Sequence, residues 1–232
     1  FGILMRNTLR ISLSTLVVTF PAPIILALLF NELRAQRFSK LVQNASYLPH
    51  FISLVVVCGI IKDFTSDKGI ATSLLSVFGM PRVSLLNYPK YFVPVYVVSE
   101  VWKGVGWGSI IYLAALTSID ASLYEAATID GAGRFKQLIH VTLPGISSTI
   151  IMMLIIRLGN VLTVGYEKLI LLYNDATLEV ADVISTYVYR KGLLEQNWSY
   201  STAVGLFNSA VSLIMLFATN FISRKVSDYG LW

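Results

Sequence analysis

Five long apolar runs dominate this chain and limit what it can fold into. A helix needs about 20 mainly apolar residues to cross the hydrocarbon core of a bilayer. The expected spans, which are separated by segments rich in charged residues and helix breakers, are 9–30, 46–61, 91–117, 145–172 and 202–222. Only 13% of the residues are charged, about half the share that is typical of a soluble domain. The sequence therefore predicts an all-α integral membrane protein.

Prolines mark irregularities in the first two spans. Pro21 and Pro23 lie inside the first run, and their missing N–H groups free backbone carbonyls that need partners within the membrane. A kink that faces protein is expected there. The second run is short, so we expect its helix to be tilted by packing or extended at its ends.

The polar residues of the chain argue against several function classes. Cys58 is the single cysteine, which disfavours a disulfide framework or a thiolate metal cluster. His50 and His140 are isolated from each other, so no metal site is expected. The basic residues mostly punctuate apolar runs, which is not the pattern of a nucleic-acid-binding face. Their nearly even distribution between alternate loops does not orient the chain in the membrane.

The segment 118–144, between the third and fourth spans, has the pattern of two short helices joined by a glycine turn. Residues 125–129 are compatible with a helix that Gly131 and Gly133 can end. A second helix is predicted by an apolar spacing of i, i+3, i+4 and i+7, at Phe135, Leu138, Ile139 and Thr142. The small residues Ala126 and Ala127, beside the carboxylate of Glu125, would permit close approach by another chain.

This segment resembles the EAA loop of membrane subunits in ABC importers that use a solute-binding protein. The matching residues are Glu125-Ala126-Ala127, then Gly131, then Val141-x-Leu143-Pro144, with valine where the family usually has isoleucine. The wider match, which includes Asp130, is similar to the carbohydrate-uptake (maltose-type) branch. Further fragments, including 181–184 and 229–232, resemble its LplB-type oligosaccharide and polysaccharide permeases.

The resemblance implies a type I ABC importer transmembrane domain that occupies residues 1–232 as one permease domain. About five spans lie in this chain, and a sixth span N-terminal to them is expected. The loop 118–144 would be cytoplasmic, with the loops 62–90 and 173–201 on the outer side of a bacterial cytoplasmic (inner) membrane. The residues expected to couple the chain to an ATPase are Glu125, Ala126, Ala127, Asp130, Gly131, Val141, Leu143 and Pro144.

The partners that the resemblance implies are a second homologous permease subunit in a heterodimer, two ATP-binding cassette ATPase subunits and an extracytoplasmic solute-binding protein. The resemblance also implies that the chain contacts the lipid bilayer and an oligosaccharide substrate. The chain contains no G-x-x-x-x-G-K-[ST] sequence. ATP and Mg are therefore expected on the ATPase subunits, and this chain is not expected to be an enzyme. An alternative hypothesis is a secondary transporter or channel driven by an ion gradient, with Arg157 and Glu167 in a relay.

Polar residues interrupt the fourth span and are candidates for a substrate pathway: Arg157, Asn160, Thr163, Tyr166 and Glu167. Related sugar importers place polar pathway residues in the corresponding stretch, but hydrogen bonding between helices would explain these residues equally well. Arg157 and Lys168 could also suit an acidic sugar. Charges within spans usually face a bundle interior, and the i, i+3 spacing of Glu100 and Lys103 predicts that these two residues pair.

The outer loop 173–201 carries a helical apolar stripe from Val180 to Val188, with Glu179, Asp182 and Arg190 at or near its polar side. A single helix that lies on the bundle is one interpretation, and a docking surface for the binding protein is the other. In the third span, Gly104, Gly106 and Gly108 predict close helix packing or a hinge.

Overall fold

The computed structural model describes residues 2–33 and 35–227, and every regular element in these ranges is a helix. The longer elements are α1 (Gly2–Thr19), α2 (Pro21–Glu32), α3 (Gln36–Phe51), α4 (Leu54–Phe64), α5 (Ile70–Val77), α6 (Pro89–Thr117), α7 (Ala121–Ile129), α10 (Ser147–Gly159) and α14 (Trp198–Ser227). The short elements are η1 (Leu85–Asn87), α8 (Arg134–Gln137), η2 (Leu138–Thr142), α9 (Leu143–Gly145), α11 (Tyr166–Leu172), α12 (Leu178–Ala181), α13 (Ile184–Tyr189) and η3 (Arg190–Leu194).

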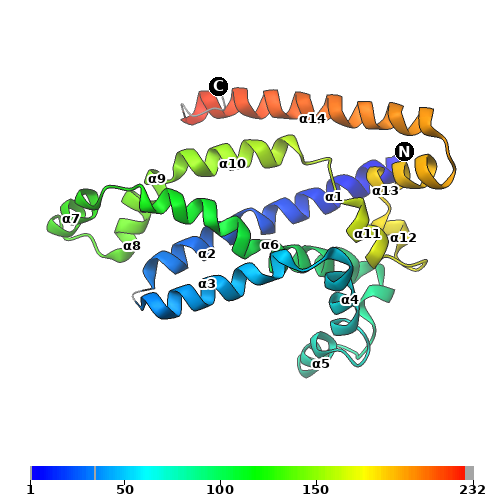
Figure 1. Ribbon diagram of the computed structural model, residues 1–232, viewed down its shortest axis with the longest axis horizontal. Helices are drawn as coiled ribbons and strands as arrows, with labels where there is room; N and C mark the ends of the chain where they lie inside the picture. The colour runs from blue at the N-terminus through cyan, green and yellow to red at the C-terminus, as the bar shows by residue number, and fades with distance from the viewer. Residues whose placement is uncertain (1, 34, 228–232) are drawn as a thin grey trace.

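The helices form an elongated bundle (Figure 1). The helices α1, α2, α6, α10 and α14 follow its long axis, and α7 to α9 project from one end. The opposite end is formed by α4, α5 and the segment from α11 to α13. Two segments, Gly2–Glu32 and Trp198–Lys225, are long and apolar enough to cross a membrane alone, and the number rises to five if each of three bent helix pairs is one span.

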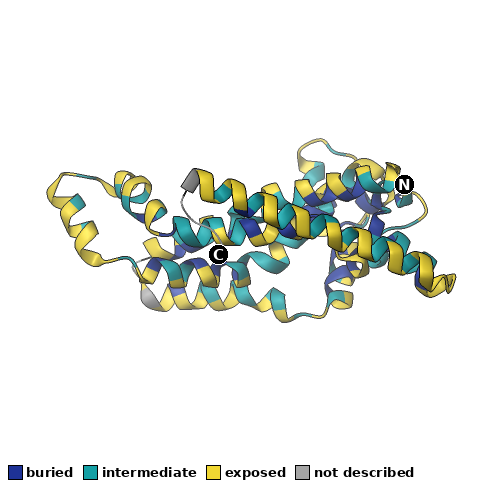
Figure 2. Ribbon diagram, turned by 90° about the horizontal axis from the view of Figure 1, so that it is seen from above, coloured by how far each residue is buried: buried dark blue, intermediate teal, exposed yellow. Residues whose placement is uncertain are grey.

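Two clusters of buried apolar side chains lie at different heights in the bundle. The first cluster joins α1, α4, α6 and α11, and includes Ile11, Val57, Phe92 and Leu169. The second cluster joins α2, α6 and the start of α10, and includes Ile24, Ala27, Tyr112, Leu116 and Ile146. Much of the remaining apolar surface is exposed (Figure 2), as expected where lipid or other subunits cover a membrane helix.

The first run is interrupted at its prolines, but Gly2–Glu32 counts as one span and is not among the helix pairs bent by more than 40°. The helix α1 ends at Thr19 and α2 begins with Pro21, a position where the missing N–H group leaves no helical bond unmade. Pro23 is buried against α6. A Cβ atom on Gly108 would lie 3.0 Å from Cγ of Pro23, and one on Gly106 would overlap the carbonyl of Ser46. Gly106 and Gly108 of the third span therefore serve close helix packing, whereas a Cβ atom on Gly104 would meet nothing within 4 Å.

The prediction of one helix through 46–61 was wrong. The helices on either side of Ile52 and Ser53 meet at an angle of 103°. The chain bends there because Nζ of Lys103 donates hydrogen bonds to the carbonyls of His50 (3.1 Å) and Ile52 (3.0 Å), which the end of α3 leaves free. The ring of His50 also stacks on Trp107, with centroids 4.6 Å apart.

These bonds lead to a first prediction, that Lys103→Met lowers the thermal midpoint of the purified protein. Each carbonyl left without a partner away from water costs about 1–3 kcal/mol. Exposed Lys62, at the end of α4, provides the control, and Lys62→Met is expected to leave the midpoint almost unchanged. Equal midpoints for the two variants would show that Lys103 does not hold the bend.

The expected pairing of Glu100 with Lys103 was also wrong. Glu100 instead pairs with Lys168 of α11, whose Nζ lies 2.7 Å from Oε1 of Glu100. The side chain of Lys168 is 3% exposed and that of Glu100 is 35% exposed. The ammonium group also lies 4.8 Å from the centroid of the Tyr96 ring. Lys168 is therefore held in a structural ion pair and is not free to meet an acidic sugar.

The fourth run, 145–172, is also not one continuous helix. The helix α10 ends at Gly159, and the chain continues without regular structure until α11 begins at Tyr166. The backbone hydrogen bonds in this link join residues that are close in sequence; the N–H of Thr163, for example, donates to the carbonyl of Asn160 at 2.9 Å. Polar side chains in a broken helix are expected where the backbone lines a cavity rather than lipid.

Candidate coupling hairpin and substrate pathway

The segment 118–144 forms the predicted hairpin of two short helices at one end of the bundle (Figure 1). Gly131 has φ +73°, a left-handed conformation that suits glycine. The turn is closed by hydrogen bonds from Ala132 N to Ala127 O at 2.8 Å and from Gly131 N to Thr128 O at 3.0 Å. Gln137 Nε2 then donates to Thr128 Oγ1 at 3.0 Å, which ties the second helix to the first.

The return of the hairpin to the bundle contains a π-helical turn, η2, that the sequence analysis did not predict. The N–H of Leu143 donates to the carbonyl of Leu138, five residues earlier. Pro144, which has no N–H group to donate to the regular partner, follows directly. The signal for this irregularity was therefore the proline of the motif itself. A hydrogen bond of 3.0 Å between the hydroxyls of Tyr124 and Thr142 joins this turn to α7.

A hollow of about 390 Å³ lies between the two limbs of the hairpin. Of the predicted coupling residues, Ala126, Ala127, Asp130 and Val141 line it. The other lining residues are Leu123, Ala132, Lys136, Gln137 and His140. Glu125 is exposed on α7 outside this lining, while Gly131 forms the turn, and Leu143 and Pro144 lie in α9.

The hairpin also exposes large apolar side chains. Ile129 is 87% exposed and Phe135 is 73% exposed, and the whole hairpin protrudes from the bundle (Figure 2). Large exposed apolar side chains mark an interaction site in soluble surroundings. The arrangement can therefore receive a helix or a ridge of another protein.

The first helix of the hairpin depends on its N-cap, Asp120. Its Oδ1 accepts a hydrogen bond from the N–H of Ser122 at 2.9 Å. This bond holds the pKa of the Asp120 carboxyl below its usual value of 3.8. A depressed pKa in the folded state means that the cap stabilises α7 above the ordinary pKa and is lost as the pH falls through the folded pKa.

We therefore expect amide exchange in α7 to accelerate as the pH falls below about 4, beyond the intrinsic pH effect on exchange. In Asp120→Asn, whose side chain caps helices without titrating, this additional acceleration should be absent. Hydrogen exchange of the hairpin, corrected for the intrinsic rate at each pH, measures the difference. An identical pH profile in the two proteins would contradict the role of this carboxylate.

The second candidate site is a polar pocket of about 190 Å³ in the middle of the bundle. Three of the five predicted pathway residues, Arg157, Asn160 and Thr163, line it from the end of α10 and the link that follows. Tyr166 and Glu167 are not among its lining residues. The ring of Tyr166 stacks on Tyr189 of α13, with centroids 5.4 Å apart, and the side chain of Glu167 is exposed.

Sequence reasoning missed the opposite wall of this pocket. It is formed by polar residues of α1, namely Ser12, Thr15 and Thr19, together with Tyr96 and Glu100 of α6. The available signal was the spacing i, i+3 and i+7, which places the three hydroxyls of α1 on one helix face.

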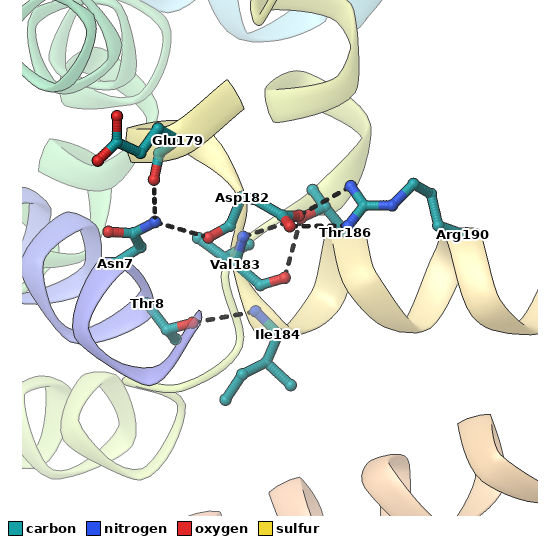
Figure 3. Close-up of polar contacts among 8 residues, drawn as sticks. All are labelled: Asn7, Thr8, Glu179, Asp182, Val183, Ile184, Thr186 and Arg190. Atoms are coloured by element: carbon teal, nitrogen blue, oxygen red, sulfur yellow. Dashed lines mark hydrogen bonds and ion pairs between the residues drawn. The ribbon is translucent and has the colours of Figure 1, made fainter. Parts of the chain in front are cut away.

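The loop 173–201 is not the single helix that its apolar stripe predicted, because α12 ends at Ala181 and α13 begins at Ile184. The break is held by α1 (Figure 3). Nδ2 of Asn7 donates to the carbonyls of Glu179 (2.7 Å) and Asp182 (3.0 Å), and the N–H of Ile184 donates to Oγ1 of Thr8 at 3.1 Å. Both α1 side chains are 1% exposed.

An ion pair completes this anchor. The guanidinium group of Arg190 donates to both carboxylate oxygens of Asp182, at 3.0 and 2.7 Å. Hydrogen bonding to Asp182 raises the pKa of Arg190, which keeps the guanidinium charged. Thr186 Oγ1 also donates to Asp182 Oδ1 at 2.7 Å. This part of the loop 173–201 is thus a fixed surface attached to α1.

The anchor predicts that Asn7→Ala accelerates amide exchange throughout residues 178–190 by at least about fivefold, since each of the two carbonyls that lose their donor costs about 1–3 kcal/mol. Asn44→Ala provides the control, because Asn44 is exposed on α3. Hydrogen exchange in the purified protein measures both. Unchanged exchange in Asn7→Ala would show that the loop is ordered by its own contacts.

An all-helical bundle with apolar spans, an exposed hairpin and a polar pocket has the features of a membrane transporter subunit. The family model for "Binding-protein-dependent transport system inner membrane component" matches residues 12–228, so the chain belongs to this family. It is a multi-pass permease subunit of an ABC importer, as the sequence predicted. These findings do not support the alternative of a transporter driven by an ion gradient.

Individual relatives agree with this assignment. Protein LplB of Bacillus subtilis is 44% identical over 99% of this chain and 72% of the relative. The polygalacturonan/rhamnogalacturonan transport system permease protein YteP of the same organism is 43% identical over 100% of this chain and 73% of the relative.

Two crystal structures also match. One is a bacterial ABC transporter that imports the acidic polysaccharide alginate, with 45% identity, a TM-score of 0.93, and coverage of 98% of this chain and 80% of the other. The second is a bacterial alginate ABC transporter in complex with an alginate pentasaccharide-bound periplasmic protein, with 45% identity, a TM-score of 0.94, and coverage of 100% and 81%.

Proposed function

We propose that this chain forms one half of the translocation pathway in an ATP-driven importer of oligosaccharides or polysaccharide fragments. Its partners would be a second, homologous permease, two ATP-binding cassette subunits and an extracytoplasmic solute-binding protein. Sugar-transport permeases among the relatives support the substrate class, and the alginate transporter with its bound periplasmic protein supports the partners.

The observation that carries the proposal is the hairpin 118–144. It presents a hollow at one end of the bundle, and four of the nine residues that line it, Ala126, Ala127, Asp130 and Val141, belong to the motif that implied coupling. An ATPase subunit would seat against this hollow, with Glu125 as a charge partner on its rim. Movement of the ATPase would then be passed through η2 into α10.

ATP and Mg would be bound by the ATPase subunits. The chain has no phosphate-binding loop sequence, and within the described ranges no group of three or more His, Cys, Asp or Glu side chains could hold a metal ion. In this proposal the chain itself catalyses no reaction. Arg157, Asn160 and Thr163 would contact the passing sugar through their hydrogen-bonding groups.

A reconstituted transporter with all of its subunits tests the proposal. Proteoliposomes should take up an oligosaccharide only when the loaded binding protein is outside and ATP is hydrolysed inside. An ionophore that dissipates proton and sodium gradients should leave uptake unchanged. Uptake that continues without nucleotide, but follows an imposed ion gradient, would overturn the proposal.

A further inference from the structure

A closed ring of hydrogen bonds joins the two limbs of the hairpin 118–144. The hydroxyl of Tyr124 lies 3.0 Å from Oγ1 of Thr142, and Thr142 in turn donates to the carbonyl of Gln137 at 3.4 Å. The side-chain amide of Gln137 donates to Oγ1 of Thr128 at 3.0 Å. The hydroxyl of Thr128 then donates to the carbonyl of Tyr124 at 2.7 Å. The ring therefore leaves Tyr124 through its side chain and returns to its backbone.

The protons of the ring fix the direction of each bond. A carbonyl can only accept, so the single hydroxyl proton of Thr142 goes to Gln137. The hydroxyl of Tyr124 is then the donor to Thr142. The same reasoning makes Thr128 the acceptor of one amide proton of Gln137, whose second proton goes to the carbonyl of Ala132 at 3.1 Å. Each of these protons has an acceptor, and loss of either the Tyr124 or the Thr142 hydroxyl opens the ring.

Thr142 is the point where this ring meets the bundle. Within the segment 118–144, all of which the structure describes, it is the one buried residue, with 4% of its surface exposed. Its carbonyl accepts a hydrogen bond from the N–H of Ile146 at 3.2 Å. Ile146 is fully buried in the second cluster, together with Tyr112 and Leu116. A displacement of Thr142 is therefore passed to side chains of α2, α6 and α10.

The backbone offers a longer and softer route from α7 to the bundle. It runs through the turn at Gly131 and Gly133 and then through α8 and η2. Glycine restrains the backbone least of all residues, and a Cβ atom on either glycine would meet nothing within 4 Å, so no packing supports this turn. The bond between Tyr124 and Thr142 crosses the same 18 positions of sequence in one contact. It is the direct connection between the first helix and the root of the hairpin.

We propose that Tyr124 and Thr142 are positioning residues through which movement of α7 reaches the bundle. This inference rests on the proposed function, in which an ATPase subunit seats against the hairpin. Tyr124 directly precedes Glu125, the expected charge partner of that subunit, so a displacement of α7 acts at once on the Tyr124 hydroxyl. With the bond intact, α7 pulls on the end of η2 directly. Without the bond, the glycine turn absorbs part of the movement and ATP is hydrolysed without transport.

Variants that remove or keep one hydroxyl test this role. Tyr124→Phe and Thr142→Val each delete a hydroxyl at nearly unchanged shape, whereas Thr142→Ser retains one. Thr117→Val is the control, because the hydroxyl of exposed Thr117 donates within α6, to the carbonyl of Ala114 at 2.7 Å. The complete transporter is placed in proteoliposomes with its loaded binding protein. The readout is the number of ATP molecules hydrolysed for each tritiated trigalacturonate taken up, or for each galactotriose if the parent imports that sugar instead.

Tyr124→Phe and Thr142→Val should each raise the ATP consumed per sugar by at least about threefold, since one hydrogen bond corresponds to roughly two- to tenfold in an equilibrium. Recovery of the ATPase with the purified permease should stay at the parental level. Thr142→Ser and Thr117→Val should keep the parental ratio. The double variant of Tyr124→Phe and Thr142→Val should equal the single ones, because both remove the same bond.

A parental ratio in both single variants would overturn the inference, as would effects that multiply in the double variant. If hydrolysis and uptake fall together because the ATPase is no longer recovered, the ring serves only the fold of the hairpin, and the inference is rejected. ATP-dependent import by the parent, with variants that couple normally, rejects this inference alone. A parent that imports neither sugar with ATP rejects the proposed function and the inference with it.

Discussion

Glu125→Lys is expected to weaken the association between this chain and its ATPase subunit by about 30-fold or more, and to abolish uptake accordingly. Loss of one partner from a charge pair in an interface costs about 2–5 kcal/mol, and each 1.4 kcal/mol is a factor of ten. Reversal adds repulsion to that loss. Glu125 is exposed beside the hollow of the hairpin, so the substitution leaves the packing of the bundle untouched.

Recovery of the ATPase with the purified permease measures the association, and proteoliposome uptake measures its consequence. Asp63→Lys carries the same change of charge at an exposed position at the end of α4, at the opposite end of the bundle, and should retain both properties. If Glu125→Lys kept the ATPase subunit bound at the normal level, the hairpin would not be the coupling site.

The second large effect is expected at the buried ion pair. Glu100→Gln leaves the ammonium of Lys168, 3% exposed, without its counter-ion. Removal of one partner of such a pair costs about 3–5 kcal/mol because the other charge stays buried. We therefore expect a markedly lower thermal midpoint for Glu100→Gln, and a substantial recovery when Lys168→Met is added, since no buried charge then remains.

A surface pair in the same chain provides the comparison. Nζ of Lys191 lies 2.6 Å from Oε2 of Glu195, and the two side chains are 34% and 52% exposed, respectively. Pairs of this kind contribute about 0–1 kcal/mol, so Glu195→Gln should shift the midpoint only slightly. Equal shifts for Glu100→Gln and Glu195→Gln, measured in the same detergent, would refute the structural role of the Lys168 pair.

The hairpin could be predicted from the sequence because its determinants are local. A short helix, a glycine with positive φ and a second short helix follow one another within the segment, and the motif residues meet there without help from distant elements. The chain's membership of a permease family was predicted from the same residues.

Contacts between distant segments could not be read in this way. The spacing of Glu100 and Lys103 permits pairing, but the tertiary structure gives each a better partner. Glu100 pairs with a buried ammonium group, and Lys103 donates to two free backbone carbonyls. Likewise, the polarity of Arg157 suggested a pathway residue, but several residues that line the same pocket come from α1, far away in the sequence. Local periodicity also cannot show where a long apolar run will break, as it does after Phe51 and Gly159.

The π-helical turn η2 has a mechanical consequence for the whole subunit. Its backbone departs from regular α-helical hydrogen bonding where the N–H of Leu143 donates to the carbonyl of Leu138. A force on the hairpin therefore reaches this irregular turn before it reaches the regular helix α10. We expect the movement of the hairpin to be taken up as a rotation about residues 138–142. The membrane-embedded part of α10 would follow that rotation. The length of this π-helical turn, rather than the stiffness of the membrane-spanning helices, would then set how far the interior of the bundle opens for each ATP that is hydrolysed.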